Sequence, residues 1–230
     1  MAGPLPRNLL PDTAKIGPEG NTAVGGCDLV NLANQWGTPL FVYDEDHLRS
    51  RCREAVAAFG GGVAYASKAF LCSAMARLAH EEGLQLDVAT GGELFLARRA
   101  GVPGNRLVLH GNNKSDAELA MAVDEGVGRI VIDSFDELDR LEALHSATGV
   151  VPRVLLRVTP GVEVHTHEFI ATGQDDSKFG FTVKGGLADS AVRRASASTA
   201  VDLVGLHAHI GSQVFDVEPF AQAIDVLAAF

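Results

Sequence analysis

The chain of 230 residues is poor in basic side chains, in paired cysteines and in long apolar runs. It has 19 Lys and Arg against 29 Asp and Glu, and no Lys/Arg cluster interrupts this acidic balance. A surface that neutralises phosphates is therefore missing, and we expect no nucleic-acid partner. The three cysteines form neither a C-x-x-C pattern nor an even set, which indicates free thiols in a reducing cytosol.

No apolar segment of signal-peptide length opens the chain, and no later run approaches the length of a membrane span. We therefore expect a soluble, cytoplasmic protein with no membrane partner. Apolar residues make up 47% of the sequence, which is close to the globular average and allows a sizeable core.

The sequence has six apolar, β-branched runs, and the first five recur at intervals of about 22 residues, which is typical of βα units in a parallel sheet. The interval before the sixth is roughly double. The six runs cover residues 62–67, 84–89, 106–111, 129–133, 152–158 and 202–210. Helical patterns lie between them, with N-caps expected at Ser115 and Ser134 and C′ glycines expected at Gly83, Gly101, Gly126 and Gly149. A loop of about 20 residues follows the fifth run, and loops of that length are usually functional.

Before these runs, residues 1–38 are rich in Pro, Gly and Asn, with one short helix expected around 27–37. A short strand is expected at "LFVYD" (40–44), where Asp44 would N-cap the following helix.

Either a doubly wound sheet or a (β/α)8 barrel would fit this pattern. No G-x-G-x-x-G or P-loop follows the first run, which disfavours a nucleotide-binding sheet. A barrel carries its chemistry at the carboxyl ends of its strands, and polar residues lie there: Lys68, Asp87, His110, Asp133, Arg157 and His209. We therefore predict a TIM-type (β/α)8 barrel that is incomplete, because only about six units can be counted and closure needs eight.

Lys68 ends the first run, in "GGVAYASKAF". A lysine at a strand end can extend to water. It can also be a partly desolvated amine that forms a Schiff base with a carbonyl substrate or with pyridoxal phosphate. The surrounding residues leave both interpretations open.

His207 and His209, in "GLHAHIGSQ", should face the same way because they alternate on a strand. Such a pair can hold a metal ion, as in a metal-dependent barrel hydrolase. Alternatively, one imidazole stacks on a cofactor ring while Gly211 and Ser212 donate to a phosphate. Two core histidines with local hydrogen bonds are the third possibility.

The other strand ends carry less specific signals. Asp87 is placed to face the barrel mouth, whereas Glu93 is interpreted as a residue of the next helix start. Arg157 ends an apolar strand and needs an anionic partner if it is buried. The "HTH" at 165–167 is interpreted as polar surface with little weight as a metal site.

Six stretches, taken in order, resemble motifs of the fold-type III pyridoxal-phosphate-dependent decarboxylases. They are "GTPLFVYDEDHLR", "YASKAF", "DVATGGEL", "HGNNKS", "LLRVTPGVEVHTHEFIATGQDDSKFGF" and "HIGSQ". The fifth is similar to the long loop of the diaminopimelate branch, and it favours that branch. An ornithine- or arginine-type decarboxylase of the same family is the alternative.

This resemblance implies decarboxylation of meso-2,6-diaminopimelate to L-lysine, the last step of lysine biosynthesis. It implies that Lys68 forms the Schiff base with pyridoxal 5'-phosphate, that His209 stacks on the cofactor ring and that Ser212 binds its phosphate. Asp87 and Arg157 would line the lysine's side of the pocket.

The resemblance also implies a homodimer, with Lys178 toward the partner subunit. The family's glycine-triplet phosphate loop, its Glu-Pro-Gly-Arg motif and its proton-donating cysteine have no counterpart here. We expect residues 1–43 to be an extension with a strand of an absent C-terminal β-domain, and 44–230 to be the partial pyridoxal-phosphate-binding barrel. The 230-residue chain alone is expected to be an inactive, poorly stable fragment. A non-enzymatic pyridoxal-phosphate carrier is a rival interpretation, which the long loop argues against.

Overall fold

The structure, a computed structural model, describes residues 6–162, 179–212 and 214–230. The chain divides into two compact units. One comprises Met1–Val63 with Leu78–Leu84, and the other comprises Ala64–Arg77 with Gln85–Phe230. Each unit is described by itself.

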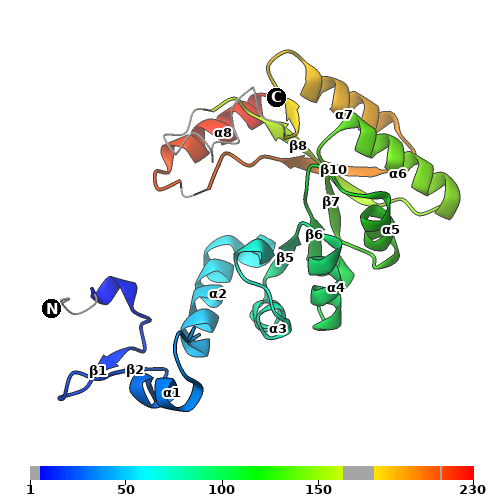
Figure 1. Ribbon diagram of the computed structural model, residues 1–230. Coiled ribbons are helices and arrows are strands. Elements are labelled where there is room, and N and C mark those ends of the chain that lie inside the picture. The colour runs from blue at the N-terminus through cyan, green and yellow to red at the C-terminus, as the bar shows by residue number, and fades with distance from the viewer. Residues whose placement is uncertain (1–5, 163–178, 213) are drawn as a thin grey trace. The chain divides into compact units, whose positions relative to one another are not determined.

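The first unit contains a small antiparallel sheet and two helices (Figure 1). Its elements are η1 (Arg7–Leu9), β1 (Lys15–Ile16), β2 (Thr22–Val24), β3 (Cys27–Asp28), α1 (Leu29–Trp36), α2 (Glu45–Phe59) and η2 (Gly60–Gly62). The expected short helix is confirmed by α1. The expected N-cap is also confirmed, because Asp44 Oδ1 accepts from the His47 N–H at 3.2 Å.

The strand expected at residues 40–44 is wrong. Residues 40–43 have no regular structure, and neither sheet of the described residues includes them. A strand forms only where a neighbouring strand accepts and donates its backbone hydrogen bonds. Apolar alternation alone cannot supply that neighbour, and Phe41 is 88% exposed here.

The second unit is built on six parallel strands in the order β10-β8-β7-β6-β5-β4. They are β4 (Ala64–Ala66), β5 (Gln85–Val88), β6 (Leu107–Leu109), β7 (Arg129–Ile132), β8 (Arg153–Thr159) and β10 (Asp202–His207). Every predicted strand of this set is confirmed. Consecutive strands are neighbours throughout, as in a (β/α)8 barrel, whereas a doubly wound sheet reverses its order at a switch point. The short β9 (Phe181–Thr182) pairs with the end of β8.

Helices follow the strands as the periodicity predicts, and α4, α5 and α6 lie along one face of the sheet (Figure 1). The helices are α3 (Ser73–Glu81), α4 (Gly91–Arg99), α5 (Asp116–Asp124), α6 (Phe135–Thr148), α7 (Leu187–Ala197) and α8 (Glu218–Ala229). Short 3-10 turns complete the unit at η3 (Ser67–Ala69) and η4 (Gly104–Arg106). The core comprises fully buried strand side chains such as Leu86, Ile130 and Leu156 and helix side chains such as Leu94, Leu119 and Leu138.

Three successive helices begin with the same Ser/Thr-x-x-Glu arrangement. The N-cap hydroxyls accept from the N–H of a glutamate three residues on, in the pairs Thr90/Glu93, Ser115/Glu118 and Ser134/Glu137. The glutamates in turn accept backbone N–H groups of Ala89, Ser115 and Asp133. The predicted caps Ser115 and Ser134 are thereby confirmed, and so is Glu93 as a residue of the helix start. Each carboxylate fixes the turn that leaves a strand end.

The four predicted C′ glycines also have the left-handed backbone that the position requires, with φ of 94°, 93°, 62° and 72° at Gly83, Gly101, Gly126 and Gly149.

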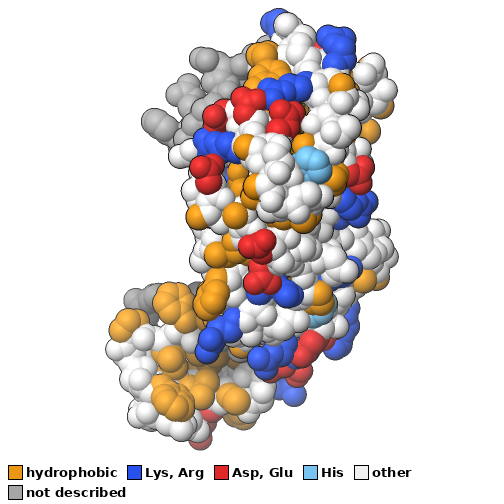
Figure 2. All heavy atoms as spheres, turned by 90° about the vertical axis from the view of Figure 1, so that its right-hand side faces the viewer, with side chains coloured by type: hydrophobic (Ala, Val, Ile, Leu, Met, Phe, Trp, Pro, Cys, Tyr) orange, Lys and Arg blue, Asp and Glu red, His pale blue; other side chains and the backbone are white. Residues whose placement is uncertain are grey.

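Charged side chains of both signs are interspersed on the face shown in Figure 2. In the ranges that the structure describes, no helix combines the length and the apolar character needed to cross a membrane.

Two glycines allow two turns to cross each other closely, one before β6 and one before β7. The Gly128 N–H donates to the Gly104 carbonyl at 2.9 Å. A Cβ on Gly104 would lie 1.8 Å from the Glu125 carbonyl oxygen, and a Cβ on Gly128 would lie 2.4 Å from the Asn105 carbonyl oxygen. Backbone atoms cannot move aside as a flexible side chain can, so any side chain at these positions displaces the crossing.

We therefore expect Gly104→Ala to lower the free energy of unfolding by about 2 kcal/mol or more, as for other overpacking substitutions. Gly61→Ala is the matched control, because nothing lies within 4 Å of its added Cβ. Chemical denaturation of both variants measures the difference. Equal stability of the two variants would contradict the close crossing.

Candidate active site at the strand ends

The polar residues expected at the strand ends do lie at the carboxyl ends of six strands. They are Lys68 in η3 after β4, Asp87 on β5, His110 after β6, Asp133 after β7, Arg157 on β8 and His209 after β10. The parallel register brings these ends to one edge of the sheet.

Asp87, His110 and His207 form the inner group of this edge. His110 Nε2 lies 3.2 Å from Asp87 Oδ1. The rings of His110 and His207 meet edge to face, with centroids 4.9 Å apart. Two strands separate β6 from β10 in the sheet, so this contact shows that the sheet curves and that the two rings meet across its inner face.

His207 is uncharged at neutral pH. Burial, together with the positive charges of its neighbours, lowers the pKa of His207 from 6.5 to about 3. Its Nδ1 is buried and has no hydrogen-bond partner in the described part of the chain.

His209 is half-buried, and its pKa is also lowered. The main cause is burial, followed by the positive charges of Arg157 and Lys68. Asp87, His110 and Arg157 act electrostatically on both His207 and His209. A neutral imidazole at this place can stack on an aromatic ring without bringing a charge to it.

Arg157 is buried, as the sequence allowed, and it has the carboxylate partner that burial requires. Its Nη1 lies 3.6 Å from Asp133 Oδ2, and its guanidinium carbon lies 4.4 Å from the centre of the Phe179 ring. The Gly180 N–H donates to Asp133 Oδ1. Burial raises the pKa of Asp133 and lowers the pKa of Arg157. The guanidinium is thus held between a carboxylate and an aromatic ring.

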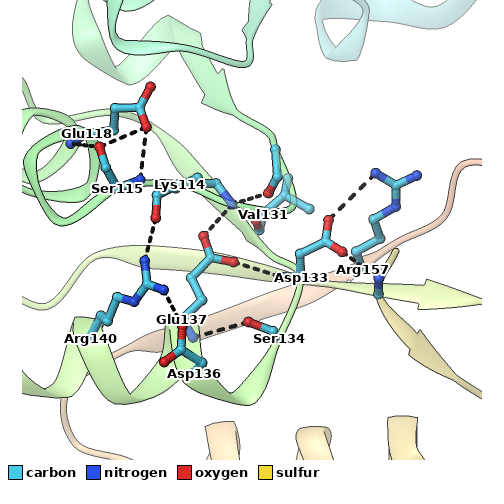
Figure 3. Close-up of polar contacts among 12 residues, drawn as sticks. Lys114, Ser115, Glu118, Val131, Asp133, Ser134, Asp136, Glu137, Arg140 and Arg157 are labelled. Atoms are coloured by element: carbon cyan, nitrogen blue, oxygen red, sulfur yellow. Dashed lines mark hydrogen bonds and ion pairs between the residues drawn. The ribbon is translucent and has the colours of Figure 1, made fainter. Parts of the chain in front are cut away.

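Lys114 and Glu137 form a buried ion pair next to Asp133, as Figure 3 shows. The Lys114 amine also donates to the carbonyls of Gly111 and Val131, at 2.7 and 2.6 Å. Glu137 in turn accepts the Asp133 N–H at 2.8 Å. Burial lowers the pKa of Lys114 and raises the pKa of Glu137.

The sequence did not identify this pair. Lys114 stands in the polar turn "HGNNKS", which a cap explains, and its partner is 23 residues away. The one available signal was Glu137 at the third position of a capping box.

Ser212 and Gly211 follow His209, and Ser212 is half-buried. Gly211 has φ of 145°, a conformation that residues with a Cβ rarely adopt. Because glycine has no side chain, a ligand can approach its backbone closely. The Lys68 side chain is exposed and not packed away in the core.

This donor set fits pyridoxal 5'-phosphate. It offers a primary amine, a neutral imidazole, a hydroxyl beside a bare glycine backbone, and a fixed cation at Arg157. Among the described residues, no group of three or more His, Cys, Asp or Glu side chains could hold a metal ion. Two predicted features, the "HTH" at 165–167 and Lys178, lie outside the described residues.

A curved parallel sheet with an amine, imidazoles and a guanidinium at its strand ends defines the chain as part of a barrel enzyme whose site opens at the carboxyl edge. Residues 45–230 match the family described as "pyridoxal-dependent decarboxylase, pyridoxal binding domain". The chain belongs to this family.

Individual relatives show which decarboxylases of this family the chain resembles. The chain is 55% identical over 221 residues to the diaminopimelate decarboxylase of Mycobacterium tuberculosis, covering 95% of this chain and 49% of that protein. It is 48% identical over 222 residues to the diaminopimelate decarboxylase of Bacillus subtilis, covering 94% and 51%. The crystal structure of the M. jannaschii diaminopimelate decarboxylase with L-lysine superposes with a TM-score of 0.88 at 33% identity, covering 95% and 52%. The chain thus spans about half the length of the curated relatives it matches.

The depressed pKa of His207 predicts a loss of stability in acid. Because the folded pKa of about 3 lies below the unfolded value of 6.5, the unfolded chain takes up the proton first as the pH falls. The contribution of neutral His207 is complete above pH 6.5 and is lost between pH 6.5 and about 3.

We expect the free energy of unfolding to fall more steeply with acidification in the wild type than in His207→Gln. One proton corresponds to a difference in slope of about 1.4 kcal/mol per pH unit. Urea denaturation at pH 4 to 8 measures both slopes. The two proteins should behave in parallel above pH 7, and parallel slopes at every pH would contradict a buried neutral His207.

Proposed function

We propose that the protein is a pyridoxal-phosphate-dependent decarboxylase that converts meso-2,6-diaminopimelate to L-lysine. The observation that carries the proposal is the exposed Lys68 amine after β4, whose charge acts on the neutral His209, in a chain of the pyridoxal-binding family. Relatives named diaminopimelate decarboxylase support this choice of substrate.

Five residues of this chain would hold the cofactor. Lys68 would bind it covalently, His209 would lie against its ring, and Ser212 would donate to its phosphate. Asp87 and Arg157 would line the lysine's side of the pocket. When bound, pyridoxal phosphate accepts the electron pair that remains as the carboxylate leaves as carbon dioxide.

The chain itself contributes position and charge. The Asp133 carboxylate and the Phe179 ring fix the guanidinium of Arg157, so that its charge does not reorganise during the reaction. The lowered pKa of His209 keeps its ring neutral near pH 7, which leaves Lys68 and Arg157 as the positive groups beside it. Asp87 places a carboxylate at the same edge.

We also propose that residues 1–43 extend a β-domain formed by sequence that the longer relatives have, while 44–230 form the partial cofactor-binding barrel. In the first unit, the side chains of Phe41 and Tyr43 are 88% and 53% exposed, as expected for a segment that another domain would cover. The family resemblance supports a homodimer in the cytoplasm.

The assignment of Lys68 is tested by borohydride reduction of the full-length protein with pyridoxal phosphate, followed by peptide mapping. We expect the pyridoxyl label on Lys68, and we expect Lys68→Ala to lower turnover by roughly three orders of magnitude. Lys184→Arg is the control variant and should keep the label. A label on any other lysine would refute the assignment.

The substrate is tested by turnover of the full-length protein with meso-diaminopimelate, ornithine and arginine as alternatives. We expect carbon dioxide and lysine from meso-diaminopimelate alone. Residues 1–230 by themselves should show no turnover, because the family motifs for the phosphate, the ring nitrogen and the proton donor are not among them. Preferred turnover of ornithine or arginine would overturn the proposed substrate, and activity of residues 1–230 alone would overturn the second expectation.

A further inference from the structure

Asp87 is held in place by His110. The His110 N–H of the backbone donates to the Val88 carbonyl at 2.7 Å, which anchors the residue beside β5. Its Nε2 then lies 3.2 Å from Asp87 Oδ1, where an imidazole N–H can hold a carboxylate. The two side chains are only 20% and 35% exposed, so solvent competes weakly for this contact.

His207 contacts the His110 ring across the inner face of the curved sheet. Their rings meet edge to face at 67°, and His207 reaches this position from β10. Asp87, His110 and His207 therefore form one contact chain that joins β5, the residue after β6 and β10.

The charged groups around His110 come from every neighbouring strand. Asp87 on β5 and Asp133 after β7 supply negative charge, while Arg157 on β8 supplies positive charge. Asp133 already accepts from Gly180 and pairs with Arg157, whereas the polar contact of Asp87 is with His110. The orientation of the Asp87 carboxylate is thus controlled chiefly by His110.

We propose that His110 and His207 are positioning residues of the cofactor site. His110 directs the Asp87 carboxylate toward the amine side of the site, and His207 keeps the His110 ring in place. The inference rests on the proposed function, because it takes Lys68 as the residue that bears the cofactor.

The test uses the full-length holoenzyme with His110→Phe, His110→Gln, Asp87→Asn and the double variant Asp87→Asn/His110→Phe. Phenylalanine keeps the ring but removes the N–H, and glutamine restores a donor. Three readouts are measured: the dissociation constant of pyridoxal phosphate, the pH midpoint of the bound cofactor's visible absorption, and kcat separately from KM. His145→Gln, in α6 and outside the site, is the control.

We expect His110→Phe to lower kcat by about tenfold, the effect of one hydrogen bond to a charged group, with a smaller change in KM. The pH midpoint of the bound cofactor's visible absorption should shift in the same direction in His110→Phe as in Asp87→Asn. The double variant should lose no more than Asp87→Asn alone, since His110 acts through Asp87. His110→Gln should recover most of kcat, and His145→Gln should leave the absorption unchanged. His207→Phe should give a smaller version of the His110→Phe effect.

Additive losses in the double variant, or an unchanged absorption midpoint in folded His110→Phe, would overturn the inference. If His110→Phe does not fold, His110→Ala alone and combined with Asp87→Asn gives the same comparison, because alanine also removes the imidazole N–H. A pyridoxyl label on Lys68 with additive losses refutes the positioning role alone. A label elsewhere refutes the proposed function, whatever the His110 variants do.

Discussion

The buried pairing of Lys114 with Glu137, and of Arg157 with Asp133, is the constraint on which the strand-end region depends. Four charged side chains lie out of water there, at 3%, 4%, 8% and 5% relative exposure respectively. Each charge would be costly to bury alone, and the arrangement is tolerable because every charge has an opposite neighbour. Lys114, Glu137 and Asp133 also form hydrogen bonds with the backbone. The ends of β6, β7 and β8 must therefore stay in register for the charges to remain paired.

This pairing connects the framework to the site. Glu137 uses one oxygen for Lys114 and the other for the Asp133 backbone, and Asp133 then reaches Gly180 and Arg157. The start of α6, the end of β7 and Gly180 are thus connected to the Arg157 guanidinium, and Figure 3 shows Glu137, Asp133 and Arg157 in this arrangement. Gly180 permits this, since a Cβ there would lie 2.6 Å from the Arg157 carbonyl oxygen. The Arg157 guanidinium is therefore held by groups from several parts of the chain.

Local patterns predicted most of the elements. The six strand runs, the caps Ser115 and Ser134 and the C′ glycines were predicted because each follows from side-chain periodicity or from a local backbone requirement. The strand at 40–44 failed because its existence depends on a partner strand that no local pattern specifies. Lys114 was missed for a related reason, since a lysine in a polar turn gives no sign of a glutamate 23 residues away.

The sequence by itself determined the order of strands and helices, the placement of polar residues at strand ends and the motifs that Lys68, His209 and Ser212 belong to. These properties depend on the spacing of residues along the chain, which the sequence gives directly. The tertiary structure decided which of those residues meet. It set His110 between Asp87 and His207, made His207 and His209 neutral through burial, and gave Arg157 its carboxylate. Burial and through-space charge arise only when the sheet curves and its strand ends converge.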